Sequence, residues 1–141
     1  MLSHKIPKPQ LIAAAESYAK VSPFADACYR YYFYLDDVAR THLIAVLATE
    51  FAEHLTTLPT KYHQPVIHAA LTELSYPKKP NALRIFPVKE RACCVGVSRR
   101  QYYRLPFDTA IDDIINQITA IAKVVAGKVQ AQLGKNFQAG Y

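Results

Sequence analysis

The sequence predicts an all-α fold: a helical bundle with a helix-turn-helix in its C-terminal half. Only four glycines but nine prolines occur in 141 residues, which is typical of helices separated by prolines and not of a sheet with glycine-rich turns. Apolar residues recur at the helical period in two long segments. No segment shows sustained strand alternation, and the best strand candidate, 83–88, is short.

Composition excludes several classes of protein. A hydrophobic fraction of 51% and a charged fraction of 20% argue against wholesale disorder. The longest apolar run, Leu43–Ala48, is six residues long, whereas a transmembrane helix needs about 20. The first residues hold no apolar stretch of signal-peptide length, and three cysteines form no disulfide framework. We therefore expect a cytoplasmic protein without membrane contact.

Proline positions and apolar spacing divide the first half into helices. A helix is expected over 9–20 after a short polar arm. Ser22 and Pro23 then form a helix start, an N-cap followed by proline at the first helical position, for a helix over 23–35. The clearest helix of this half spans 36–58, where Leu43, Leu47, Phe51 and Leu55 form an apolar stripe and Asp36 and Asp37 favour the N-terminal end.

A shorter helix is expected from Pro65 to about Leu74, and an irregular segment at 76–82 follows it. This segment is the candidate boundary between a helical scaffold or partner-binding region, 1–76, and a basic region, 77–141. One continuous compact domain is the alternative. The charge balance also changes at this boundary, from −1 over 1–76 to +7 over 77–141.

The basic residues concentrate between Lys78 and Arg104, where eight Lys and Arg accompany a single acidic residue. Such a cluster is typical of proteins that bind a polyanion, because each cation that meets a phosphate releases condensed counterions. A solvated basic face is the alternative.

The same stretch carries the pattern of a helix-turn-helix. Pro87 can begin a helix that runs to about Val95, with the small residue Ala92 on its inner face. Gly96 can take the left-handed conformation that ends a helix, and Val97 fills the corner. Ser98 is a preferred N-cap for a second helix over 99–104, which Pro106 ends. In such a unit the second helix lies in the major groove of DNA.

The segment Ala92-Cys-Cys-Val-Gly-Val-Ser-Arg-Arg-Gln-Tyr-Tyr-Arg resembles the A-x-x-L-G-V-S-x-x-T-Y-Y-R helix-turn-helix of bacterial and phage regulators. Over about 86–133 the chain is similar to sigma-factor region-4-like modules, and most similar to phage antitermination Q-type and ArpU-type regulators. Val95 replaces the usual leucine, and Pro106 shortens the second helix. The resemblance implies a transcriptional regulator, of phage or prophage origin, that acts with RNA polymerase.

We therefore expect a sequence-specific binder of double-stranded DNA that is not an enzyme and uses no cofactor. Arginine and glutamine are the residue types that pair with guanine and adenine edges. The alternative is a non-enzymatic helical interaction protein that binds RNA polymerase or another host protein and whose helix-turn-helix is structural only. The candidate DNA-binding residues are Ser98, Arg99, Arg100, Gln101, Tyr102, Arg104, Lys78, Lys79, Arg84 and Lys89.

The C-terminal segment predicts a long helix capped near Asp108 and Thr109, with Gly134 as its stop. Its apolar residues follow a heptad-like spacing. Two interpretations stay open: a helix packed across the domain core, or the seam of a homodimer that reads a two-fold DNA site. The residues of the possible dimer seam are Ile111, Ile115, Ile118, Val125 and Val129.

Three further patterns favour structure over chemistry. The aromatic run 29–35 could stack on bases, but core packing is the favoured interpretation. Cys93 and Cys94 lack the spacing of zinc ligands and are interpreted as small apolar filler, so no metal is expected. Neither a phosphate-binding glycine loop nor a nucleophile motif occurs.

Overall fold

The computed structural model describes residues 22–138, and this part of the chain is helical without any β-strand. The all-α prediction is confirmed, and segment 83–88 is not a strand. The helix expected over 9–20 lies outside the described residues. The elements are α2 (Pro23–Tyr34), α3 (Asp37–Ala45), α4 (Leu47–Glu50), α5 (Ala52–Leu55), the 3-10 helix η1 (Thr60–Tyr62), α6 (His63–Leu74), α7 (Val88–Val95), α8 (Arg99–Arg104) and α9 (Phe107–Gln138).

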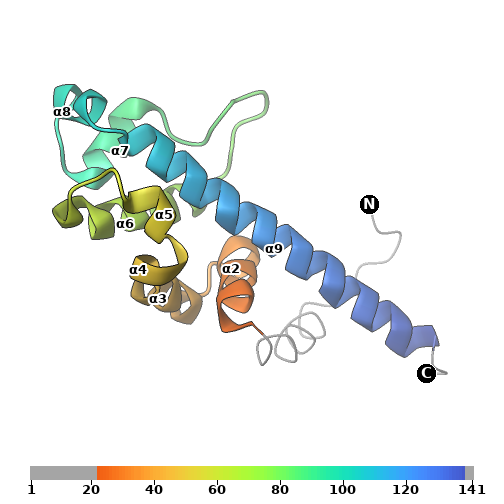
Figure 1. Ribbon diagram of the computed structural model, residues 1–141. Helices are drawn as coiled ribbons and strands as arrows, with labels where there is room; N and C mark the ends of the chain where they lie inside the picture. The colour runs from red at the N-terminus through yellow and green to blue at the C-terminus, as the bar shows by residue number, and fades with distance from the viewer. Residues whose placement is uncertain (1–21, 139–141) are drawn as a thin grey trace.

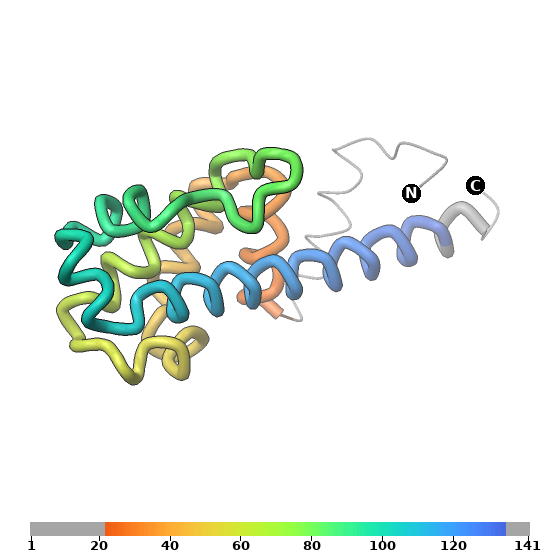
Figure 2. Tube along the Cα trace, turned by 90° about the horizontal axis from the view of Figure 1, so that it is seen from above, coloured from red at the N-terminus to blue at the C-terminus, as the bar shows by residue number. Residues whose placement is uncertain are grey.

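Helix α9 organises the molecule. It is 32 residues long, and α2, α5, α6 and α8 all contact it. Figure 1 shows the other described helices gathered along the N-terminal part of α9, with its C-terminal part extending past them. Seen from above in Figure 2, segment 76–87 and segment 47–62 lie on opposite sides of α9.

The hydrophobic core crosses the boundary expected at 76–77. One cluster joins Leu43 and Ile67 of the first half to Ala92, Tyr102 and Ile118 of the second. A smaller cluster packs α2 against the C-terminal part of α9, and the partly buried Ile121 contacts both clusters. The described helices of both predicted regions therefore share a continuous core.

The caps of α2 and α3 follow the sequence closely. The Ser22 hydroxyl accepts a hydrogen bond from the Ala25 N–H at 3.3 Å, and Pro23 is the first helical residue. Leu35 ends α2 in the left-handed conformation, at φ 53°. Asp36 then caps α3 by accepting from the Val38 N–H at 2.8 Å and the Ala39 N–H at 3.2 Å.

The single helix expected over 36–58 is wrong. The chain leaves regular helix at Val46 and Phe51, with φ and ψ of −98° and 12° and of −111° and 9°, and forms α3, α4 and α5 instead. The breaks let the Phe51 ring meet Phe24 edge-on at 5.5 Å between ring centroids, and both Phe51 and Leu55 are buried. Tertiary packing overrides the local periodicity here.

Three other boundaries are informative. Helix α6 begins at His63, so Pro65 sits in its first turn, where backbone N–H groups have no intrahelical acceptor. Segment 76–82 is irregular, as expected, and the irregular stretch continues to residue 87. The stop predicted at Gly134 is wrong, because α9 continues to Gln138. Neither Gly127 nor Gly134 adopts positive φ, and an interior glycine costs a helix only about 1 kcal/mol.

Candidate nucleic-acid interface

Helices α7 and α8 are joined by a turn whose geometry matches the sequence prediction. Gly96 is left-handed at φ 86°, and its N–H donates to the carbonyls of Ala92 at 2.9 Å and Cys93 at 3.1 Å. The Val97 N–H donates to the same Ala92 carbonyl at 3.1 Å. These bonds satisfy the last carbonyls of α7, and Ala92 is buried beneath the turn.

Helix α8 begins and ends where the sequence predicts. The Ser98 hydroxyl accepts from the Gln101 N–H at 3.1 Å, which caps the helix. Leu105 is extended, at φ −122° and ψ 156°, because the residue before a proline is driven out of the helical region. The helix is therefore only six residues long.

Helix α8 presents cations to solvent. Arg99, Arg100 and Arg104 are exposed, and none of the three forms an ion pair with another described residue. Tyr103 beside them is 68% exposed. A shallow groove of about 340 Å³ runs along the helix and is lined by Ser98, Arg100, Gln101, Arg104 and Leu105.

The opposite side of α8 anchors it to the core, and this corrects one predicted contact. Tyr102 is buried, stacks on Phe107 at 5.4 Å between centroids, and donates its hydroxyl to Asp108 at 2.6 Å. It is not available to DNA. Gln101 is half-buried and donates its side-chain amide to the Tyr62 hydroxyl at 2.6 Å, so this amide is engaged within the protein.

The remaining predicted cations divide into two groups. Lys78, Lys79 and Lys89 are exposed. Arg84 is half-buried, and its guanidinium lies 2.6 Å from the Asp108 carboxylate, so its charge is largely neutralised. Figure 1 shows segment 76–87 and α8 on the same side of the molecule with α7 between them.

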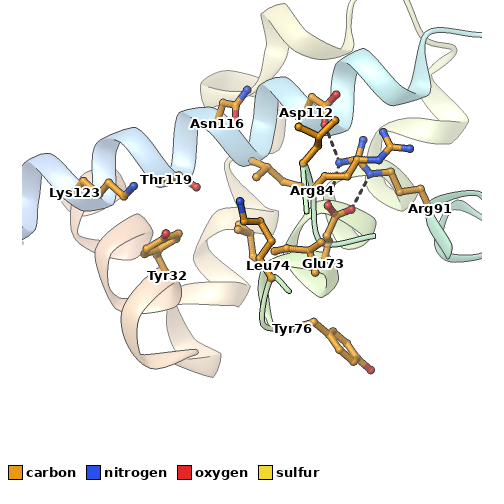
Figure 3. Close-up of a pocket in the computed structure, with 14 residues that line it drawn as sticks. Tyr32, Glu73, Leu74, Tyr76, Arg84, Arg91, Asp112, Asn116, Thr119 and Lys123 are labelled. Carbon is orange, nitrogen blue, oxygen red and sulfur yellow. Dashed lines mark hydrogen bonds and ion pairs between the residues drawn. The ribbon is translucent and has the colours of Figure 1, made fainter. Parts of the chain in front are cut away.

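Arg91, counted in the basic cluster of the sequence, is not part of the surface. It is 1% exposed, and its guanidinium forms a bidentate pair with Glu73 at 2.8 and 3.0 Å. It also donates to Asp108 at 3.1 Å and to Asp112 at 2.7 Å. Dashed lines in Figure 3 mark its contacts with Glu73 and Asp112. The network ties α6, α7 and α9 together.

The network shifts the protonation equilibria of its members. Burial by itself lowers the pKa of Arg91, but the hydrogen bonds to Glu73 and Asp112 outweigh it and leave that pKa above its usual value. Burial likewise raises the pKa of Asp108, yet the Tyr102 hydroxyl and the Arg84 guanidinium hold it below its usual range. Both groups are therefore charged at neutral pH.

A sequence signal for this network existed and was missed. Glu73 falls on the same helical face as Val66 and Ala70, and Arg91 on the same face as Val88 and Val95, at spacings of three, four and seven residues. A charged residue on an apolar face is rarely buried without a partner. Because Glu73 and Arg91 have opposite charges and each lies on the apolar face of its helix, the pattern predicts that they form an ion pair.

The residues of the possible dimer seam are buried by the chain itself. Ile111, Ile118, Val125 and Val129 are at most 2% exposed, and Ile115 is half-buried against the main cluster. The seam interpretation is therefore wrong for these residues, because α9 uses them to hold the other described helices. The core alternative describes them correctly.

The other sequence features also have defined places. Tyr29 and Tyr31 of the aromatic run are buried, and the Tyr31 hydroxyl donates to the Leu71 carbonyl, in agreement with core packing. Cys93 and Cys94 are exposed, so their interpretation as apolar filler is wrong. Burial raises the pKa of the third thiol, Cys28, to about 12. Within 22–138, no three His, Cys, Asp or Glu side chains are grouped to hold a metal ion.

Comparison of the chain with models of protein families, with curated proteins and with solved structures finds no match. Across the described residues, no helix combines the length and apolar character that crossing a bilayer requires. The geometry of α7, α8 and segment 76–87 is therefore the basis for assigning a function.

Proposed function

We propose that the protein binds double-stranded DNA with sequence preference and regulates transcription. Helix α8 lies in the major groove, and the lysines of segment 76–87 and α7 contact phosphates. The observation that carries this proposal is the two-sided character of α8. Its arginines face solvent and have no ion-pair partner among the described residues, while the buried Tyr102 anchors the opposite side of the helix.

The arrangement suits groove binding for a physical reason. A recognition helix reads bases with residues near its N-terminus, and Arg99 and Arg100 are the first two residues of α8. An arginine can donate two hydrogen bonds to a guanine edge. Because the buried side of the six-residue helix packs against the core, the positions of both arginines relative to the groove are fixed.

The regulatory part of the proposal is a transcription factor of phage or prophage type, acting with RNA polymerase as an activator or antiterminator. Its support is the sequence resemblance of the α7–α8 segment to such regulators. The competing function is a protein-binding surface, and Tyr103 supports it. An exposed tyrosine among arginines is also typical of the centre of protein interfaces.

Two steps test the proposal. Bound sequences are first selected from random duplexes, and the preferred site is then titrated with the protein. Arg100→Ala is expected to cost about 1–3 kcal/mol on that site and to relax its sequence preference. Lys79→Ala is expected to weaken all sequences alike, because a phosphate contact carries no sequence information.

Lys123→Ala is the matched control. It removes a charge of the same sign from an exposed position of α9, more than four helical turns from the start of that helix, and is expected to leave DNA affinity unchanged. Absence of duplex binding at low salt contradicts the proposal. So does an equal, sequence-independent loss in all three variants, because then α8 does not read bases.

A further inference from the structure

A second hollow lies between α9, the end of α6 and segment 76–86, apart from the exposed side of α8. Its volume is about 540 Å³, within the range of small-molecule sites. Figure 3 shows Asn116, Thr119 and Lys123 following one another along α9, with Tyr32 of α2 near them and Glu73 on the α6 side.

The acidic groups of this cavity are already engaged. Glu73 and Asp112 both line it, and both accept hydrogen bonds from the buried guanidinium of Arg91. Arg84, a further lining residue, is paired with Asp108. The arginines and carboxylates of the wall therefore neutralise one another.

The groups that remain available are cationic or neutral. Lys78 and Lys123 line the cavity, and neither ammonium group has an ion pair or hydrogen bond with another described residue. The side chains of Asn116 and Thr119 likewise have no hydrogen-bond partner within the described part of the chain. Apolar side chains complete the wall, among them Leu74, Ile85 and Ile115.

We propose that this cavity binds a small organic anion. Its anionic group is bound by Lys78 and Lys123, its polar atoms by Asn116 and Thr119, and its apolar body lies against Leu74, Ile85 and Ile115. A cation is disfavoured because the two carboxylates are committed to Arg91 and the two free charges are positive. A DNA duplex is too wide to enter the cavity, so this site differs from the surface of α8, although Lys78 is also one of the proposed phosphate contacts.

Phenyl phosphate is the probe, since it joins a dianion to a flat apolar body. Titrated into the full-length protein and followed by amide NMR, it is expected to bind in saturable fashion with a Kd below about 1 mM, the affinity that about eleven heavy atoms can supply. The shifted signals are expected along residues 115–123 of α9. Benzoate replaces the phosphate by a carboxylate and so distinguishes the two kinds of anion, and inorganic phosphate lacks the apolar body.

Two variants make the test specific. Lys123→Met keeps a side chain of similar length but removes its charge. It is expected to lower the affinity for phenyl phosphate about tenfold. Lys61→Met, at an exposed position of η1 and outside the cavity, is expected to leave the affinity unchanged. Both positions are exposed, so both variants fold, and thermal unfolding verifies it.

Three outcomes overturn the proposal. The first is absence of saturable binding by both phenyl phosphate and benzoate at about 10 mM, well above the expected Kd. The second is equal weakening by Lys61→Met, which indicates general charge attraction. The third is inorganic phosphate binding as tightly as phenyl phosphate, which leaves no role for the apolar wall. Each can occur whether or not the protein binds DNA, so failure here is distinguishable from failure of the proposed function.

Discussion

Glu73 and Arg91 are the two charged residues that the described structure buries completely, and each depends on the other. Removing one partner of such a pair leaves the other charge uncompensated in a poorly solvated site. We expect Glu73→Gln to lower the free energy of unfolding by about 3 kcal/mol or more. Urea denaturation followed by circular dichroism measures this change.

The control for that variant is Glu90→Gln, which removes an exposed acid from α7. Its effect on unfolding should stay within about 0.5 kcal/mol. If the two variants are equally stable, the Arg91 network does not hold α6 and α7 together as the distances indicate.

Asp108 makes the stabilising effect of the same network depend on pH. Its pKa in the folded state lies below the ordinary value of 3.8, because the hydrogen bonds from Tyr102 and Arg84 outweigh the effect of burial. The folded state therefore gains stability from this group above the ordinary pKa. That contribution is lost as the pH falls through the lower folded pKa.

We accordingly expect Asp108→Asn to be less stable than the unmodified protein at pH 7, and the difference to shrink as the pH is lowered from 5 toward about 2. Thermal unfolding across this interval tests the sign. A difference that stays constant with pH means that the ionised carboxylate is not the stabilising form.

At the scale of the elements, the two kinds of glycine in this chain should respond in opposite directions. Gly96 needs its positive φ of 86°, whereas Gly127 lies inside α9, and an added Cβ meets no atom within 4 Å at either position. Gly96→Ala is expected to cost about 1 kcal/mol of stability. Gly127→Ala is expected to add up to about 1 kcal/mol.

Chemical denaturation of this matched pair separates backbone conformation from packing, because neither change creates a clash. Loss of stability in both variants contradicts the uninterrupted helical geometry of α9 at Gly127. A gain in both contradicts the left-handed turn at Gly96.

The role of α9 as a core element gives a further prediction. Ile118 is fully buried, whereas Val124 of the same helix is 57% exposed. Ile118→Asp is expected to unfold the protein, since a buried unpaired carboxylate costs several kcal/mol. Val124→Asp should leave it folded.

Circular dichroism measures whether each variant is folded, and sedimentation velocity measures its oligomeric state. A folded, monomeric Ile118→Asp variant of a dimeric parent contradicts the core assignment and restores the seam interpretation. A helical spectrum for Val124→Asp with an unchanged sedimentation coefficient shows that the exposed face of α9 tolerates charge.

The elements differ in how far the sequence predicts them. Some depend on bonds between neighbouring residues of the chain, and others depend on contacts with residues far away in the sequence. Ser22, Asp36, Gly96 and Ser98 act through bonds to residues within four positions, so their caps and turns follow from the sequence alone. The breaks at Val46 and Phe51 depend on contacts such as that between Phe51 and Phe24. No pattern in the neighbouring residues predicts such contacts.

The same distinction applies to the candidate interface. The cap, the length and the exposed arginines of α8 were predictable from residues 96–106. That Tyr102 turns inward was not, because its partners Phe107 and Asp108 are presented by the start of another helix. Burial of Arg91 depends in the same way on Glu73, eighteen residues away.

For the whole molecule, these corrections change the expected strength of the electrostatic interaction with DNA. Eight clustered cations predict a dependence of log Kobs on log salt with a slope as steep as about −7. With Arg91 buried and Arg84 paired, six exposed cations remain: Lys78, Lys79, Lys89, Arg99, Arg100 and Arg104.

We therefore expect a slope between about −3 and −5, measured by fluorescence anisotropy from 50 to 300 mM salt. Arg104→Ala should make it shallower by about one unit. A slope near zero contradicts DNA binding by this surface. A slope steeper than about −6 indicates cations outside the described cluster or a second protein copy on the DNA.

The packing of α2 against α9 also sets an order of events during synthesis. Helix α9 follows every other described helix in the chain, yet its side chains complete both hydrophobic clusters, including the one that covers Ala25 and Tyr29 of α2. Until the ribosome has released α9, the earlier helices can pack only on one another, and both hydrophobic clusters stay incomplete. Completion of the fold is thus a late event, and nascent chains that stop before α9 are exposed to chaperones and proteases.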